Sequence, residues 1–381
     1  MIIAVAAIAI LFNTFFAKKL PLIEGVILII HVFGFFGILV RKNSRSNLIH
    51  RADNAQVPLW ALAPRQPAKA VFTEFRNDYG WPSQGLGCLV GIIGPIYSLI
   101  GPDSAVHMAE EIKDASRVLP LGMIWTLVLN GITGFIMVIT FAFCIGDLDA
   151  AISPSYSYAY IGTFYTATGN KAGSTVMACL IILMCLCSTI SNVATASRQM
   201  FAFARDRGMP FSTFLCRYVS WESPTTTLCN SLIFTTSVRP GWDIPLNAVC
   251  VSFVITCLLS LVNLGSAVAF NAIVSLTVGA ILSSYIISIS CVALRKIRGD
   301  PLPHARWRLG RAGLACNIIA VLFLLLVYVF AFFPLATPVE LTTMNWSSLI
   351  YGSVVIFSIY YYFVFGRHAY EGPVVLVNKD F

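Results

Sequence analysis

The chain has 381 residues, of which 57% are hydrophobic and only 11% charged, and its mean hydropathy is +0.80. A soluble domain usually carries about 25% charged residues, so this composition excludes an ordinary soluble protein and indicates a polytopic helical membrane protein. The formal charge of +8 does not indicate a nucleic-acid partner, because the basic residues form short clusters between apolar runs.

The eleven cysteines are odd in number and lie mostly inside apolar segments, which argues against a disulfide framework. Cys185 and Cys187 lack the spacing of zinc ligands, so we interpret them as small core residues. The sequence predicts no metal site and no cofactor.

About nine apolar runs follow one another, and we expect an all-α fold in a single transmembrane domain, 1–381. The first run begins without a charged segment before it, so it is a poor signal peptide. The predicted runs are 1–16, 20–40, 82–107, 119–145, 172–203, 244–263, 267–294, 312–333 and 346–365.

The loops between these runs alternate in charge. Counted from the first, the odd loops hold most of the Lys and Arg residues, so we expect the loops around Lys113, Arg205 and Arg306 to face the cytoplasm. The loop around Ser155 is then expected outside. The second loop violates the alternation, because the basic segment 40–56 should also lie outside.

The third run carries the most informative stretch, 87–113, which reads GCLVGIIGPIYSLIGPDSAVHMAEEIK and contains two Gly-Pro pairs. Proline removes a backbone donor and glycine tolerates unusual dihedrals, so the helix is expected to open near Gly101–Asp103. An opened backbone at membrane depth is tolerated only beside protein or a cavity, where it can bind a polar solute.

Asp103 is the first candidate for chemistry, since a carboxylate inside a membrane segment is costly unless it faces a cavity or a partner. It can hold an amine, titrate, or simply cap the half-helix that begins at Ser104. Tyr97 can stack on a cation or serve as a core aromatic, and His107 can relay protons or be structural. The predicted substrate-binding residues are Tyr97, Gly101, Pro102, Asp103 and Ser104.

Further charged residues lie near the expected cytoplasmic end. Glu110 and Glu111, with Lys113, are expected to pair with Arg198 or Arg205 as a gate or brace rather than to bind substrate. The candidates for a proton relay or gate are therefore His107, Glu110, Glu111, Arg198 and Arg205. Ser188, Ser191 and Asn192, and likewise Asn271, Ser275 and Thr277, are either polar packing residues or ion ligands.

Several long motifs resemble one family, and they occur in its order along the chain. GPDSAVHMAEEIKDASRVLP resembles the helix-six signature of fungal permeases of the amino acid–polyamine–organocation superfamily, in the amino acid/choline (GABA) branch. ASRQMFAFARDRGMPFS, WDIPLNAV, FNAIVSLTVGAILSSYIISI and GRHAYEGPVV resemble it too. The resemblance implies two inverted five-helix repeats with broken helices one and six at the substrate site.

The chain departs from that pattern in three places. The resemblance begins at helix four, so we expect the first three helices to be missing and the 381-residue chain as written not to transport. The segments 40–56 and 219–237 have no counterpart in the family. Each begins with residues that codons can write as an intron start, so we interpret both as translated introns rather than genuine loop insertions.

The resemblance implies a secondary transporter of amino acids or related amines such as GABA or choline, coupled to protons, in the plasma or vacuolar membrane. The expected partners are the amine substrate, protons and the lipid bilayer, and no nucleic acid. The alternatives are a non-functional truncated fragment and a membrane-embedded enzyme. An enzyme would need a catalytic cluster, and only Asp103 and His107 approach one.

Overall fold

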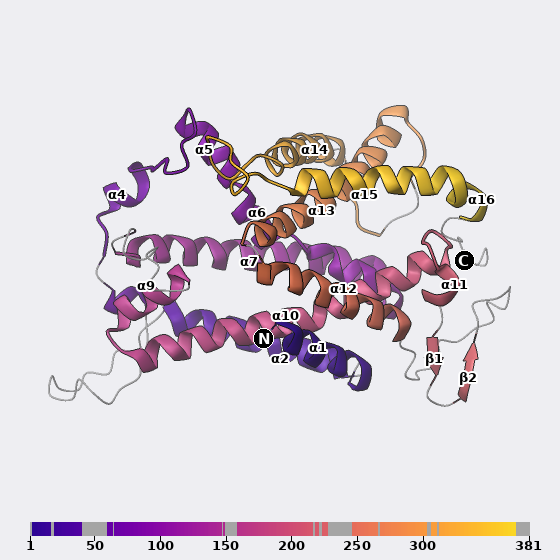
Figure 1. The fold of residues 1–381 in the computed structure, drawn as a ribbon, viewed down its shortest axis with the longest axis horizontal. Coiled ribbons are helices and arrows are strands. Elements are labelled where there is room, and N and C mark those ends of the chain that lie inside the picture. Colours follow the sequence, from indigo (N-terminus) through magenta and orange to yellow (C-terminus); the bar gives the residue numbers. More distant parts are fainter. Residues whose placement is uncertain are drawn as a thin grey trace. The chain divides into compact units, whose positions relative to one another are not determined.

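The fold was taken from a computed structural model that describes residues 2–16, 19–39, 59–63, 65–146, 148, 158–215, 218–220, 223–227, 246–265, 267–302, 306–310 and 312–370 (Figure 1). Nearly all of its elements are helices. In chain order they are α1 (Ile2–Phe15), α2 (Leu20–Leu39), α3 (Leu59–Leu62), α4 (Ala68–Thr73), α5 (Gln84–Gly91), α6 (Ile93–Leu99), the 3₁₀ helix η2 (Pro102–Glu111), α7 (Ala115–Cys144), α9 (Ala159–Thr168), α10 (Lys171–Arg205), α11 (Ser212–Leu215), β1 (Tyr218–Ser220), β2 (Ser223–Thr227), α12 (Leu246–Gly265), α13 (Ala267–Arg298), α14 (Ala312–Phe330), α15 (Ser347–Tyr361), the π-helical turn η3 (Tyr362–Gly366) and α16 (Arg367–Ala369).

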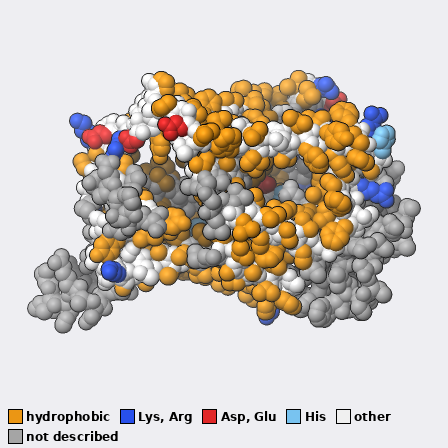
Figure 2. All heavy atoms as spheres, in the orientation of Figure 1, with side chains coloured by type: hydrophobic (Ala, Val, Ile, Leu, Met, Phe, Trp, Pro, Cys, Tyr) orange, Lys and Arg blue, Asp and Glu red, His pale blue; other side chains and the backbone are white. Residues whose placement is uncertain are grey.

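Six helices in the described part of the chain are long and apolar enough to cross a membrane, and a bent pair brings the number to seven. Two shorter apolar helices, Ile2–Phe15 and Asn247–Leu261, lie in the first and sixth predicted runs. Hydrophobic side chains predominate among the described residues on the face drawn in Figure 2. These helices confirm the prediction of a multi-pass, helical integral membrane protein.

The predicted insert 219–237 overlaps the described strands. β1 and β2 form an antiparallel hairpin in which Tyr218 is opposite Thr227 and Ser220 opposite Ser223. The rest of this insert, and the whole of the insert 40–56, lie outside the described residues.

The chain divides into two compact units that are each discontinuous in sequence. Unit 1 comprises Met1–Ile10, Arg76–Thr126 and Asn192–Phe381, and unit 2 comprises Leu11–Phe75 and Leu127–Ser191. The core of unit 2 includes Leu59, Cys144, Phe164 and Met177.

The core of unit 1 lies where α6 packs on the helices α13 and α14. Val278 and Leu282 of α13 and Val327 and Ala331 at the end of α14 are almost fully buried there. Isoleucines of the α5–α6 segment pack against them, namely Ile92, Ile93, Ile96 and Ile100. The third predicted run is therefore held along one face by the seventh and eighth runs.

Two contacts in unit 1 join loops that the charge alternation assigns to the same side. Arg306, before α14, forms an ion pair with Asp114, before α7, with 2.6 Å between Nη1 and Oδ1. In the second contact, Thr337, after α14, donates its backbone N–H to Tyr79, before α5, at 2.9 Å and its hydroxyl to Gly80 at 2.5 Å. Both contacts agree with the predicted alternation.

Candidate functional site

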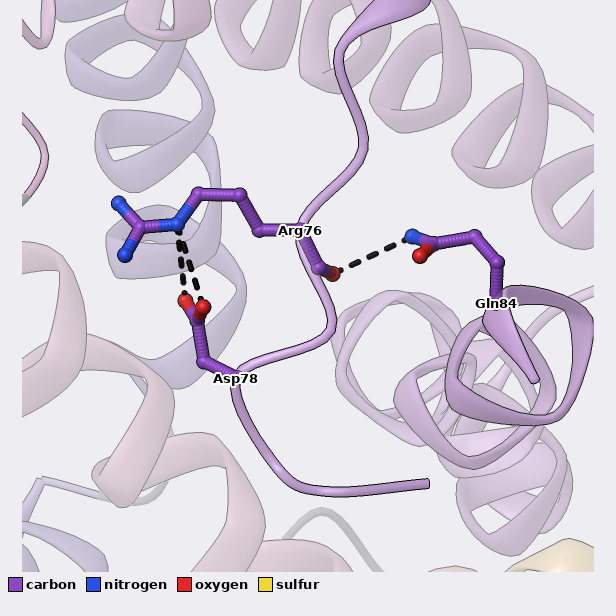
Figure 3. A network of polar contacts seen from close by, with 3 residues as sticks. All are labelled: Arg76, Asp78 and Gln84. Atoms are coloured by element: carbon purple, nitrogen blue, oxygen red, sulfur yellow. Dashed lines mark hydrogen bonds and ion pairs between the residues drawn. The ribbon is translucent and has the colours of Figure 1, made fainter. Parts of the chain in front are cut away.

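The entry to the broken helix is fixed by short-range polar contacts before α5. Arg76 Nε lies 3.1 and 3.2 Å from the two carboxylate oxygens of Asp78, and Gln84 donates to the Arg76 carbonyl at 3.2 Å (Figure 3). The hydroxyl of Ser83 accepts from the Leu86 amide at 3.2 Å and so caps the first turn of α5. The helix therefore begins at a defined point just before the membrane segment.

The helix breaks where the second Gly-Pro pair predicts. Ile100 is extended, with ψ 154°, and Gly101 has φ 105°. This is a left-handed backbone conformation that residues other than glycine rarely adopt. Pro102, which has no N–H to donate, then begins η2. The two halves, Gln84–Leu99 and Pro102–Ala109, are bent by 42°. A side chain built at Gly101 would meet no atom within 4 Å, so the backbone at the break faces open space.

Asp103 lies directly after this break and has two side-chain partners. The hydroxyl of Tyr285 donates to Asp103 Oδ1 at 2.5 Å, and His107 Nε2 lies 3.4 Å from Oδ2. The backbone of Gly101 also contacts the Tyr285 hydroxyl. The carboxylate side chain keeps 29% of its surface exposed, so it is only partly buried. In the described part of the chain, both contacts of the Asp103 carboxylate are with side chains. A helix cap would instead accept from backbone amides of η2.

Tyr285 reaches the break because α13 packs along α6. Its ring packs against the cluster of Val278, Leu282 and Val327. Tyr285 is not among the site residues predicted from the sequence. The only sign of Tyr285 in the sequence is that it is the single tyrosine of the apolar run 267–294. A single tyrosine gives no indication of the residue that its hydroxyl contacts.

The structure brings only some of the predicted site residues together. Gly101, Pro102, Asp103, Ser104 and His107 are partly buried around the break. Tyr97 is 45% exposed and lies outside the α6–α13–α14 core, so it is not a core aromatic of that cluster. The side chains of Glu110 and Glu111 lie outside the described residues, so their pairing with arginine stays a prediction.

The two arginines of the predicted gate have partners near the end of α10. Arg198 donates to the Ala194 carbonyl at 3.2 Å, and Arg205 Nε lies 3.5 Å from Asp206. Among the other polar candidates, Thr277 donates to the Ile273 carbonyl within its own helix, whereas Ser191 donates to Glu24 on another helix. In the described part of the chain, no group of three or more His, Cys, Asp or Glu residues has the arrangement of a metal site.

Comparison with known proteins agrees with this architecture. The family model described as amino acid permease matches residues 1–359. The chain is 29% identical to the choline transporter of Saccharomyces cerevisiae over 364 residues, which cover 95% of this chain and 58% of that protein. It is 30% identical over 318 residues to the 7-keto 8-aminopelargonic acid transporter of the same yeast, covering 81% and 53% of the two chains.

A third relative is the putative amino acid/polyamine transporter of Macrophomina phaseolina, 28% identical over 286 residues, covering 74% of this chain and 58% of that protein. The chain thus spans somewhat more than half the length of these relatives. No solved structure matches the chain. Because the family model covers almost all of the sequence, the chain belongs to the amino acid permease family, which confirms a permease over a membrane enzyme.

Proposed function

We propose that the permease containing this sequence carries out secondary transport of amino acids or related amines, such as GABA or choline, with proton coupling. The observation that carries the proposal is the bent membrane segment with Asp103 two residues after the left-handed Gly101. Broken helices of this kind supply the polar groups that bind solutes in secondary transporters.

Each residue around the break makes a different contact with the bound amine. The Asp103 carboxylate pairs with the ammonium group, and the donated hydroxyl of Tyr285 holds the carboxylate in place. The bare backbone of Gly101 lets the solute approach, and the Asp103 N–H at the start of η2 favours an anionic group of the substrate. The exposed ring of Tyr97 offers a face to a cation.

The same helix carries the residues proposed for protons and gating. His107 lies one turn after Asp103 and contacts its carboxylate, so it is placed to exchange a proton with it. Glu110 and Glu111 follow, and we propose that they pair with Arg198 and Arg205 when the cytoplasmic side is closed.

The names of the relatives support the substrate class. They are a choline transporter, an amino acid/polyamine transporter and a transporter of an amino-substituted acid, and all of these solutes carry a nitrogen group that can be cationic. We extend this class to the present chain. We also propose the plasma or vacuolar membrane as its location, and one permease domain, 1–381, with 40–56 and 219–237 as inserts.

The test is saturable binding of labelled choline and 4-aminobutyrate to membrane vesicles that contain this chain. Asp103→Asn removes the negative charge while keeping nearly the same shape, so we expect affinity for the bound amine to fall at least tenfold, about 1.4 kcal/mol. Asp78→Asn is the matched control, because Asp78 pairs with Arg76 before α5 and should not affect binding.

Proton coupling is tested in the same vesicles by imposing a pH gradient and following accumulation of the amine.

Unchanged amine affinity in a well-expressed Asp103→Asn protein would reduce Asp103 to a structural residue. Saturable binding that the neutral solute glycerol displaces as well as choline would contradict an amine site.

A further inference from the structure

A second carboxylate lies inside a membrane segment, away from the break. Glu24 is the fifth residue of the 20-residue helix α2, one of the six candidate spans, so it lies about 6 Å inside the helix end. Its side chain is partly buried and accepts a hydrogen bond at Oε1 from the hydroxyl of Ser191. Ser191 belongs to the middle of the 35-residue helix α10, so the pair links two membrane segments of unit 2.

A neighbouring contact fixes the part of α10 that carries this serine. Asn13 of α1 is only 4% exposed, and its Nδ2 donates to the carbonyl of Ile190 at 2.8 Å. Ile190 itself is 7% exposed and directly precedes Ser191. The polar cluster of Asn13, Glu24 and Ser191 thus joins α1, α2 and α10 within unit 2.

The geometry satisfies both protonation states of the carboxyl group. When Glu24 is ionised, the Ser191 hydroxyl donates to it. The same hydroxyl oxygen lies 3.3 Å from the carbonyl oxygen of Cys187. When Glu24 takes up a proton, its O–H can donate to Ser191 Oγ while the serine turns its own hydrogen to Cys187. The proton gained from water is the only atom added. The hydroxyl of Ser191 and the new O–H of Glu24 each have an acceptor in this arrangement.

The surroundings of Glu24 favour a proton over a metal cation. The groups of α10 that face Glu24 are the Ser191 hydroxyl and Cys187. In the segment that contains Glu24, the other ionisable residues described are Lys19 and His31, and both are exposed. No ion pair involves Glu24 in the described part of the chain. A metal cation needs several oxygen ligands, whereas a proton needs one, and the proton removes the cost of a charge in an apolar segment.

We propose that Glu24 is a proton-binding group within the membrane, with Ser191 as its hydrogen-bond switch. The proposal rests on the transport function proposed above, because a reversible proton site inside a permease serves its proton coupling. It concerns unit 2, whereas Asp103, His107 and Tyr285 belong to unit 1, so Glu24 is a second proton site in addition to the His107–Asp103 pair.

Infrared difference spectroscopy of the purified chain in lipid nanodiscs tests the site without requiring transport. On lowering the pH reversibly from about 9 to about 4, across the range in which carboxyl groups titrate, we expect a protonated carboxyl C=O band that Glu24→Gln removes. Ser191→Ala should shift the frequency of this band, because one hydrogen bond of the carboxyl group is lost, and Glu24→Asp should keep a band.

Two matched variants serve as controls. Glu74→Gln changes an exposed carboxylate at the end of α4, and Thr189→Val removes a hydroxyl that bonds only within α10. Neither should alter the band assigned to Glu24.

Three outcomes would overturn the proposal: a Glu24→Gln spectrum identical to that of the parent chain, a band that ignores Ser191→Ala, and a band that changes with Na⁺ at constant pH. Loss of amine binding with an intact Glu24 band would instead contradict only the proposed substrate class. The two proposals therefore fail in different measurements.

Discussion

At the scale of single residues, the contact that matters most is between Asp103 and Tyr285. A phenol that donates to a carboxylate forms a charge-assisted hydrogen bond, which is stronger than one between neutral groups. The tyrosine ring is anchored in the α6–α13–α14 core, so the carboxylate is held against a rigid element although its own segment is an irregular 3₁₀ helix. A preorganised carboxylate costs the protein less conformational entropy when an amine binds.

Tyr285→Phe tests this positioning role. The ring and its packing remain, but the hydrogen bond to Asp103 is lost, and such bonds are worth about 1.5–3 kcal/mol. We expect the dissociation constant of the bound amine to rise about tenfold in vesicle binding measurements, with unfolding temperature little changed. Adding Tyr285→Phe to Asp103→Asn should then cost almost nothing more, because the two residues act as one unit.

Tyr328→Phe is the control for Tyr285→Phe. Tyr328 packs against the same core, but its hydroxyl is hydrogen-bonded to Tyr351 rather than to Asp103. Equal losses of amine affinity in the two variants would show that any missing hydroxyl in this core loosens the site. Fully additive effects of Tyr285→Phe and Asp103→Asn would likewise rule out a positioning role.

At the scale of elements, the break in the third predicted run follows from two residues acting together. Pro102 cannot donate the hydrogen bond that would continue α6, and Gly101 takes the left-handed conformation that turns the chain. The break then persists because its first half is packed on α13 and α14, and its second half is tied to α13 through Asp103 and Tyr285. Local sequence creates the opening, and packing sets its angle.

Gly101→Ala should therefore destabilise the protein through its backbone alone. A methyl group meets nothing within 4 Å, but a left-handed conformation costs an alanine about 1–2 kcal/mol. We expect a lower unfolding temperature of the detergent-solubilised protein and weaker amine binding.

Gly91→Ala provides the opposite expectation, because Gly91 also has open space beside it but lies within helix α5, where alanine is the better helix former. This variant should be as stable as the parent or slightly more so. If Gly101→Ala and Gly91→Ala behave alike, the conformation at Gly101 does not govern the break.

At the scale of the whole molecule, the alternation of basic loops and the contacts between loops describe one topology. The pairs Asp114–Arg306 and Gly80–Thr337 each join loops that are separated by an even number of predicted spans. Such loops must lie on the same side of a membrane, so the contacts and the charge distribution support each other.

Cysteine labelling of intact cells tests the predicted orientation. In a cysteine-light background, Arg306→Cys should resist a membrane-impermeant maleimide, because the loop before α14 carries the basic cluster expected in the cytoplasm. Leu341→Cys, at a position 79% exposed between α14 and α15, should react. The predicted outer loop at Ser155 lies outside the described residues and offers a second outward position.

Permeabilised cells supply the reference for this experiment, since both cysteines must react there. Labelling of Arg306→Cys but not of Leu341→Cys in intact cells would invert the topology and place Glu110 and Glu111 at the outer surface.

The sequence by itself determined the class of the protein, the approximate positions of its apolar helices and the break near Gly101–Asp103. These features are local, because hydropathy, proline and glycine act on the residues beside them whatever the rest of the chain does. Only the tertiary structure decided that Tyr285 holds Asp103 and that Ser191 faces Glu24, since these partners lie 182 and 167 residues apart. Uniformly apolar membrane helices carry little periodic signal about which face meets which neighbour, so such pairs emerge only when the helices are packed.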